Sequence, residues 1–195
     1  MHPSLALIEF DSIAAGIEAG DAMAKKAPIA RLVAGTVQPG KYLVLVAGQV
    51  ADVEESLAAG LSVGAGATLD HVYLPGVHPH VVDALAGGRQ PKPIAALGVV
   101  ETRTVAAAIA AADAGIKGAE VTLLEVRLAD GLGGRGLVFF SGLVADVEAA
   151  IRIATDVIAG TPALIHAVVI PQLHSEMAAN LLADTRWRAR AREIS

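Results

Sequence analysis

Four short blocks in the first half of this sequence recur in the same order in the second half, and this repeat constrains the fold most. The pairs are Leu5–Glu9 with Leu97–Glu101, Ala19–Ala22 with Ala111–Ala114, Gly48–Glu54 with Gly142–Glu148, and Leu74–His78 with Ile170–His174. The offset grows from 92 to 94 and then to 96 residues, which places short insertions in loops of the second copy. Such self-similarity indicates a duplicated structural unit.

The duplication divides the chain into two units, which suits a length that allows one ordinary domain or two small ones. We predict the first domain at residues 4–86 and the second at residues 94–183. Residues 87–93 combine Gly, Pro and charged side chains and are typical of a linker. Residues 184–195 form an arginine-rich tail, typical of a solvated helix end, although it could also dock an acidic peptide or a neighbouring molecule.

Each copy begins with a strand and a helix. Short apolar runs predict strands at about residues 4–10 and 95–101. Ser12, or Thr102 in the second copy, has a side chain that favours the N-cap of the helix that follows. Apolar side chains at helical spacing predict the buried stripe of these two helices, namely Ile13 and Ile17, and Val105 and Ile109.

The remaining elements follow in the same order in both copies. Two strands join at the turn Gln38–Gly40, or at Leu132–Gly134 in the second copy, and a helix then carries the repeated Val-Ala-Asp-Val-Glu block. A last strand ends at Pro75 or Pro171, and a short third helix follows. The order β-α-β-β-α-β-α predicts an α+β fold related to the ferredoxin-like plait, with helices over a mainly antiparallel sheet.

Small apolar side chains dominate the composition. Hydrophobic residues make up 54% of the chain, but aromatic residues only 3%. At about 25 cal/mol per Å² of buried apolar surface, a repeat unit of this size with such small side chains has a thin margin of stability on its own. We therefore expect the protein to gain stability by oligomerisation.

The composition also disfavours several classes of protein. The chain has no cysteine, which excludes disulfides, thiolate metal sites and cysteine-ligated iron–sulfur clusters supplied by it. Its net charge of −5 disfavours nucleic-acid binding, which usually needs a basic face. The uncharged stretch 157–175 is cut by Gly160–Pro162 and Pro171, so no helical run of membrane-spanning length remains. Because Met1–Ser4 lack the basic region of a signal peptide, we expect a soluble, cytoplasmic protein.

Several of these residues resemble the shell domain of bacterial microcompartments (BMC). The resemblance rests on Glu101-Thr102 near the helix start, Ala-Ala-Asp-Ala with a lysine at the helix end, the glycine turn between strands, and Ile-Pro-x-x-His. Both copies carry this pattern in the usual, non-permuted order, and together they cover nearly the whole chain. Within the family, tandem-domain shell proteins of propanediol-utilisation compartments are the most similar, along Thr36–Lys41, Val121–Leu123 and Gly131–Gly134.

The resemblance implies a structural protein and not an enzyme. Tandem-domain members of the family form homotrimers whose six domains make a pseudohexameric tile. The tiles meet hexameric shell proteins edge to edge and close a shell around enzymes, and loops at the tile centre line a pore for small metabolites. The implied partners are further copies of the chain, other shell proteins and encapsulated enzymes, without nucleic acid or membrane. The implied location is the shell of a microcompartment in the cytoplasm.

Two turns carry the predicted pore, with Gln38, Pro39 and Gly40 in the first copy and Leu132, Gly133 and Gly134 in the second. In the propanediol-compartment relatives, the resemblance implies a cysteine that holds an iron–sulfur cluster at the place of Gln38. A carboxamide is a poor substitute for a thiolate, so we predict no cluster, no other cofactor, and an uncharged polar rim. A plain β-turn without a transport role is the alternative, and the second loop could instead fold away from the pore.

Lys25 and Lys117 occupy the place of the lysine that, in this family, packs between adjacent tiles. The resemblance therefore assigns both lysines to the tile edge. The alternative is a solvated lysine in the last helical turn, where its positive charge interacts favourably with the helix dipole.

Residues that could look catalytic are explained by the duplication. His78 and His174 are equivalent positions before a helix, and we interpret them as capping or packing residues; Glu9 and Glu101 are equivalent positions at strand ends. No catalytic constellation and no metal-binding motif emerges. Two other functions stay open: a small-molecule-binding regulator with a ferredoxin-like repeat, and an electron-conduit shell protein with an iron–sulfur cluster, which the missing cysteine disfavours.

Overall fold

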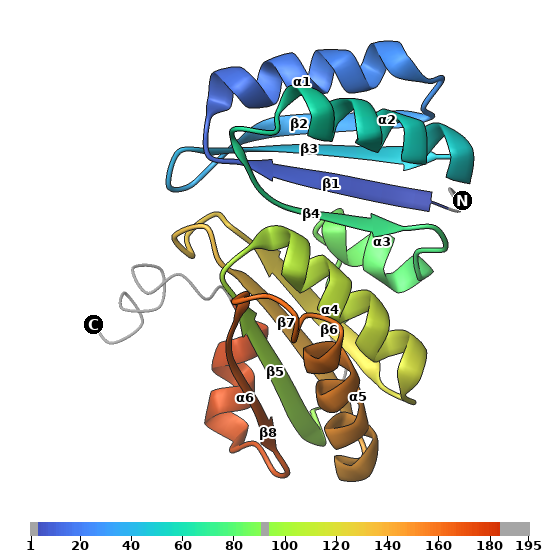
Figure 1. Cartoon of the computed structure of the whole chain (residues 1–195). Coiled ribbons are helices and arrows are strands. Elements are labelled where there is room, and N and C mark those ends of the chain that lie inside the picture. Colours follow the sequence, from blue (N-terminus) through green and yellow to red (C-terminus); the bar gives the residue numbers. More distant parts are fainter. Residues whose placement is uncertain (1–3, 91–93, 184–195) are drawn as a thin grey trace.

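The computed structural model describes residues 4–90 and 94–183 and contains two α+β domains with the same order of elements (Figure 1). The first domain comprises β1 (Ser4–Phe10), α1 (Ile13–Lys26), β2 (Arg31–Val37), β3 (Lys41–Gly48), α2 (Val50–Val63), β4 (Thr68–Leu74) and α3 (Pro79–Leu85). The second comprises β5 (Ala96–Thr102), α4 (Val105–Gly118), β6 (Thr122–Leu128), β7 (Gly136–Gly142), α5 (Val144–Asp156), β8 (Leu164–Ile170) and α6 (Ser175–Leu182). The predicted order is confirmed, and the tail 184–195 lies outside the described residues.

Each domain has one four-stranded antiparallel sheet, in the order β2-β3-β1-β4 or β6-β7-β5-β8. The predicted turns join β2 to β3 at 38–40 and β6 to β7 at 129–135. In both sheets, the pairing of the first strand with the last shifts register at an equivalent point, between Glu9 and Phe10 and between Glu101 and Thr102. The repeat therefore extends to this irregularity, whereas a further shift between β6 and β7, at Leu123/Glu125, has no equivalent between β2 and β3.

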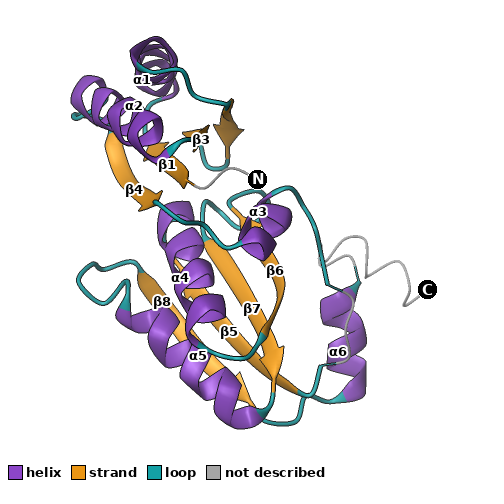
Figure 2. Ribbon diagram, turned by 90° about the vertical axis from the view of Figure 1, so that its right-hand side faces the viewer, coloured by secondary structure: helices purple, strands orange, loops and turns teal. Residues whose placement is uncertain are grey.

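Helices cover both faces of each sheet. One face is covered by α1 and α2 in the first domain and by α4 and α5 in the second (Figure 1, Figure 2). The opposite face of the second sheet packs against α6 through Leu97, Leu124 and Phe139. The equivalent helix α3 lies between the two domains, where it contacts β6 and α4 of the second domain (Figure 2).

The first helix of the second domain begins two residues later than predicted. Thr102 is the last residue of β5, and its hydroxyl donates to the backbone oxygen of Thr104 at 2.8 Å. Thr104 is the N-cap, because its side chain accepts a hydrogen bond from the N–H of Ala107. Ser12 caps α1 as predicted. The prediction of Thr102 was wrong because β5 continues through this residue, as β1 continues through Phe10.

The equivalent helices α1 and α4 differ in burial. Val105 and Ile109 are fully buried, as predicted. Their counterparts Ile13 and Ile17 are 38% and 54% exposed, so the prediction of a buried stripe on α1 was wrong. The reason is that α4 packs between its own sheet and β4 of the first domain, whereas α1 packs only within the first domain. The apolar side of each helix is the side against which a neighbouring domain can pack. Within the described chain only α4 has such a neighbour, namely the first domain.

Candidate functional site

The two predicted pore turns, one from each domain, lie in contact. The side-chain oxygen of Gln38 accepts a hydrogen bond from the N–H of Gly131 at 3.1 Å. In return, the N–H of Gln38 donates to the carboxylate of Asp130 at 3.4 Å. The turn of the first domain and the loop 129–135 of the second therefore form one continuous rim, which we call the loop rim.

The loop 129–135 depends on glycine. Gly131, Gly133 and Gly134 have φ angles of 75°, 63° and 82°, in the left-handed region that side chains disfavour. The loop closes on itself because the N–H of Ala129 donates to the oxygen of Arg135 at 2.8 Å. It leads into a strand and not into a helix, so its N–H groups do not gather at a helix N-terminus as in a phosphate-binding loop.

The residues predicted to line the pore differ in exposure. Those at the surface are Gln38, Pro39, Gly40 and Gly133, with Leu132 half-buried. Gly134 is buried, and a Cβ atom built on it would lie 2.9 Å from Cδ of Pro39. Gly134 therefore permits the close contact between the two loops, while the other five residues are at least partly exposed, and their role in a pore stays a prediction.

Behind the loop rim, a buried carboxylate joins the two domains. Glu9 is fully buried, with one oxygen 2.6 Å from Nζ of Lys41 and the other accepting from the N–H of Val105 at 2.8 Å. Val105 is the first residue of α4, where the helix dipole favours a negative charge. Lys41 also donates to the oxygen of Gly134 at 3.4 Å. The carboxylate thus ties the first sheet, the second domain and both pore loops together.

Sequence reasoning placed Glu9 at a strand end but missed its partner Lys41. The repeat held the signal, because an acid and a base recur together at equivalent positions. Glu101 and Arg135 form the corresponding ion pair at 2.7 Å, but there the side chains are 29% and 55% exposed. The second pair lies at a surface where the chain supplies no neighbouring helix.

The two predicted edge lysines lie at the ends of equivalent helices. Nζ of Lys117 is 2.5 Å from the carboxylate of Asp113 and also donates to the oxygen of Gly76 in the first domain. Asp113 is 4% exposed and accepts a hydrogen bond from the N–H of His78 at 2.8 Å. Lys25 pairs with Asp21 in the same spacing, and both of these side chains are exposed. The role of the lysines at a tile edge stays a prediction.

The paired histidines cap helices, as predicted. Nδ1 of His78 accepts from the N–H of His80 at 3.2 Å, and Nδ1 of His174 accepts from the N–H of Glu176 at 3.3 Å. Burial, followed by the nearby His80, lowers the pKa of His78 below its ordinary value; Lys117 acts in the same direction and Asp113 opposes it. The neutral ring that the cap requires is therefore favoured.

Within residues 4–90 and 94–183, no group of three or more His, Cys, Asp or Glu side chains is placed to hold a metal ion. No helix of this part of the chain has the length and apolar character needed to cross a bilayer. The hydrogen bonds and ion pairs described above hold elements of the fold together, and several of them cross the boundary between the two domains.

The two domains, which share the order of elements and the topology of the sheet, define a tandem-domain protein. The family model of the BMC domain matches residues 4–77 and again residues 96–173. The chain therefore belongs to the BMC-domain family and carries two such domains in tandem.

Individual relatives agree with this assignment. The chain is 38% identical over 177 residues to the bacterial microcompartment shell protein PduT of Citrobacter freundii, covering 91% of this chain and 96% of the relative. A crystal structure of a microcompartment protein from Desulfitobacterium hafniense DCB matches with a TM-score of 0.78 and 41% identity, over 90% of this chain and 98% of that one. A fused permuted hexameric shell protein of the RMM microcompartment shares the fold, with a TM-score of 0.57 and 22% identity over 80% and 84% of the two chains. The alternative of a small-molecule-binding regulator finds no support in these matches.

Proposed function

We propose that this protein is a structural tile of a bacterial microcompartment shell, a homotrimer whose six domains form a pseudohexameric ring around a central pore. The relatives that support this function are themselves named as microcompartment proteins. One observation supports the proposed assembly. Residues buried in the interface between the two domains have repeat equivalents that are exposed, on α1 of the first domain and on β8 and α6 of the second.

The apolar part of this observation involves four pairs of equivalent residues. The interface between the domains buries Val72, Val81, Val105 and Ile109. The equivalents left exposed are Val168, Met177, Ile13 and Ile17. The first two lie on β8 and α6, the other two on α1, so they form the two halves of the same interface. Burial of the part of each side chain that is still exposed would favour docking of a second copy, by a fraction of the roughly 1.5–3 kcal/mol that a fully exposed large side chain contributes.

The polar contacts of the interface are repeated in the same way. Within the chain, Asp113 accepts from the N–H of His78, and Lys117 donates to the oxygen of Gly76. If the same interface forms between two copies, the carboxylate of the exposed Asp21 would accept a hydrogen bond from the N–H of the partner's His174. Lys25 would donate to the oxygen of the partner's Gln172. These pairings place the same donors and acceptors together at both kinds of interface.

A head-to-tail interface either closes into a ring or grows into a filament. The family resemblance implies a ring, in which α4 would run from the centre toward the edge. Its first residue lies beside Glu9 and the loop rim, and Lys117 lies near its last residue, about 20 Å away for a helix of 14 residues. A ring that gathers the loop rims at its centre therefore carries Lys117 and Lys25 near its outer edge.

The central opening would be lined by the exposed groups of the loop rim. Gln38, Pro39, Gly40, Leu132 and Gly133 offer a carboxamide, backbone groups and one aliphatic side chain, and the exposed Asp130 and Arg135 of the same loop carry charges of opposite sign. Such a rim suits small polar metabolites and provides no thiolate for an iron–sulfur cluster. Gly134 would shape the rim from behind.

The proposed tile would contact other shell proteins at its edges and encapsulated enzymes on one of its faces. Lys25 and Lys117 are the residues we assign to the edges. The location that follows is a microcompartment shell in the cytoplasm.

The assembly is tested by the mass of the purified protein in solution and by a matched pair of variants. Native mass spectrometry is expected to give three chains. Ile17→Asp buries a charge in the proposed interface and should yield monomers. Val63→Asp is the control, because Val63 and its equivalent Val157 are both exposed, so neither interface uses this position. A monomeric wild-type protein, or trimers of Ile17→Asp as stable as the wild type, would contradict the assembly.

The function as a tile is tested separately by electron microscopy of the concentrated protein, alone and with a single-domain shell protein. We expect flat sheets or tubes with hexagonal order. Discrete particles under every condition would contradict a role in the shell even if the protein were a trimer.

A further inference from the structure

The first domain contains a pocket that the described chain leaves empty. It lies between the sheet face opposite α1 and α2 and the helix α3, with a volume of about 420 Å³. Val33 and Leu45 of the sheet and Val82 and Leu85 of the helix form much of its apolar wall. We call this the α3 pocket.

Two polar groups at the α3 pocket lack partners among the described residues. The hydroxyl of Ser4 is buried and forms no hydrogen bond there, although a buried hydroxyl without a partner is unfavourable. Arg31 lies exposed at the pocket and forms no ion pair within the described part of the chain. An apolar pocket that holds an unpaired hydroxyl and an unpaired guanidinium is suited to an amphipathic occupant.

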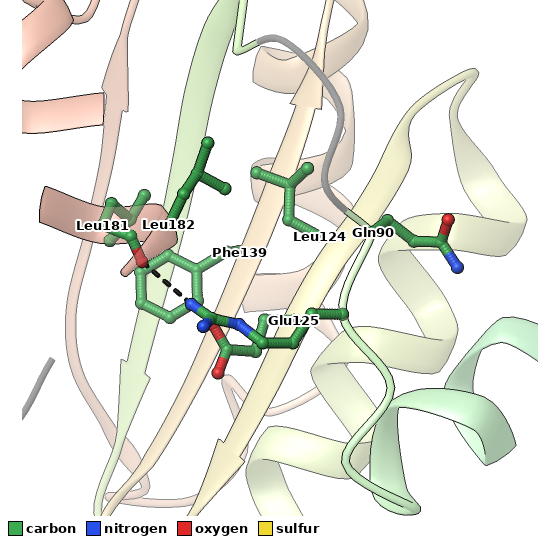
Figure 3. Close-up of a pocket in the computed structure, with 7 residues that line it drawn as sticks. Gln90, Leu124, Glu125, Phe139, Leu181 and Leu182 are labelled. Carbon is green, nitrogen blue, oxygen red and sulfur yellow. Dashed lines mark hydrogen bonds and ion pairs between the residues drawn. The ribbon is translucent and has the colours of Figure 1, made fainter. Parts of the chain in front are cut away.

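The equivalent pocket of the second domain is smaller, at about 190 Å³, and a segment of chain lines one side of it. Leu181 and Leu182 of α6 face Phe139 and Leu124 of the sheet, and Gln90 lies beside them (Figure 3). The N–H of Gln90 donates to the oxygen of Leu124 at 2.9 Å, so this segment runs along β6.

Arg89 holds this segment at the second pocket. It donates to the oxygen atoms of Leu181 at 2.9 Å and Ala183 at 3.3 Å at the end of α6, and it pairs with Glu125 at 2.9 Å. Residues 87–90 directly follow α3, the helix that crosses from the first domain to the second. The chain that leaves α3 therefore lines the pocket of the next domain.

The helix equivalent to α3 is α6, and the chain that leaves it is the tail 184–195. We propose that the tail of each copy docks in the α3 pocket of the neighbouring copy, with Trp187 as its apolar anchor. The inference rests on the proposed trimer, because in the ring the domain that follows α6 is the first domain of the next copy. Twelve residues reach up to about 40 Å when extended, enough to run along β2 as residues 87–90 run along β6.

The chemistry of the tail complements the pocket. Trp187 is the only tryptophan of the chain, and a large ring suits the apolar walls that Val33 and Leu45 provide. Its indole N–H can donate to the unpaired hydroxyl of Ser4. A guanidinium such as that of Arg31 stacks favourably on an indole face, and Asp184 supplies a carboxylate close to the start of the tail. The arginines of the tail resemble Arg89 in being able to donate to the carbonyls at the end of α3.

Because Trp187 is the single tryptophan, its fluorescence reports on the tail directly. In the assembled full-length protein we expect emission at shorter wavelength, and weaker quenching by acrylamide, than in the urea-unfolded chain. Val82→Arg places a charge in the α3 pocket at a partly exposed position and should shift the emission to longer wavelength without altering the number of chains. Val63→Arg, away from the pocket, should leave the emission unchanged. A solvent-exposed Trp187 in an intact wild-type trimer would overturn the proposal.

Docking between copies is separated from docking within one copy by mixing two variants. One carries Val82→Arg with an intact tail, and the other has an intact pocket but ends at residue 183, so all tryptophan fluorescence comes from the first. Mixed assemblies should recover the short-wavelength emission that Val82→Arg alone has lost. Failure to recover it in mixed trimers identified by mass would overturn docking between copies. A protein that forms no trimer at all would instead contradict the proposed function on which the inference rests.

Discussion

Glu9 of β1 and Val105 of α4 are joined across the domain boundary by a hydrogen bond of 2.8 Å from the backbone N–H of Val105 to the Glu9 carboxylate. The same carboxylate is fully buried and pairs with Lys41 at 2.6 Å. The contact fixes the start of α4, and with it the loop rim, to the sheet of the first domain.

Removal of this carboxylate should destabilise the protein strongly. Glu9→Ala leaves the ammonium of Lys41 and the N–H of Val105 without their partner, which costs about 3 kcal/mol or more when the group is buried. Glu9→Gln retains a hydrogen-bond acceptor and should cost less. The measurement is the free energy of unfolding in urea, at one fixed protein concentration because association contributes to stability.

The control for Glu9→Ala is Glu55→Ala, which removes an exposed carboxylate whose 3.3 Å pair with Lys26 lies within the first domain. An exposed pair of this kind contributes at most about 1 kcal/mol, so the loss of stability should stay below that value. Equal losses for the two variants would contradict the role assigned to Glu9 at the domain boundary.

Lys25→Ala should leave the trimer intact but disrupt the lattice of tiles. The ion pair of Lys25 with Asp21 and the proposed hydrogen bond to the oxygen of the partner's Gln172 contribute about 1 kcal/mol each at most, too little to open an interface built on apolar side chains. We expect trimers of normal mass and the loss of ordered sheets in electron micrographs. The matched control is Lys26→Ala, which removes the neighbouring lysine and its 3.3 Å pair with Glu55. Sheets of Lys25→Ala as ordered as those of Lys26→Ala would rule out the edge role.

The cap of α3 should make the protein sensitive to mild acid. The pKa of His78 is lowered in the folded state, chiefly by burial, so protonation favours the unfolded chain. The stability that His78 contributes is therefore complete above the ordinary pKa of about 6.5 and is lost as pH falls toward the lowered value. Protonation also removes the Nδ1 acceptor that binds the N–H of His80.

The measurement is the melting temperature between pH 5 and pH 8 for wild type and His78→Asn, which keeps a capping side chain but does not titrate. The wild type should lose more stability than the variant as pH falls below 6.5. Parallel curves for the two proteins would show that His78 does not carry the acid sensitivity.

The sequence predicted the order of elements because each copy repeats the same strand and helix patterns. It predicted the capping role of His78 and His174 because both precede a short helix at equivalent places. It misplaced the N-cap at Thr102, since a polar residue after a strand does not reveal where the strand ends, and the repeat position of Ser12 points instead to Thr104.

The exposure of Ile13 and Ile17 could not be predicted from their spacing. Helical periodicity identifies an apolar side but not the surface that covers it, and α1 and α4 share that side while only α4 has a neighbour in the described chain. The contact of Gln38 with Gly131 was also beyond the sequence, because it depends on how the two domains sit against each other.

Gln38 should hold the second pore loop in place as well as line the opening. Its carboxamide accepts a hydrogen bond from the N–H of Gly131, so Gln38→Ala leaves that N–H to solvent. A neutral hydrogen bond contributes about 1 kcal/mol, which corresponds to about a fivefold increase in local opening. We expect faster amide hydrogen exchange in residues 129–135 with little change in the melting temperature.

The control for this variant is Gln49→Ala, since Gln49 is an exposed glutamine that forms no capping hydrogen bond at the start of α2. It should leave exchange in the loop 129–135 at the wild-type rate. Unchanged exchange in Gln38→Ala would mean that the loop is held by its own bonds, such as that from the N–H of Ala129 to the oxygen of Arg135. The two loops of the rim would then be independent, and Gln38 would act on a passing solute through its side chain alone.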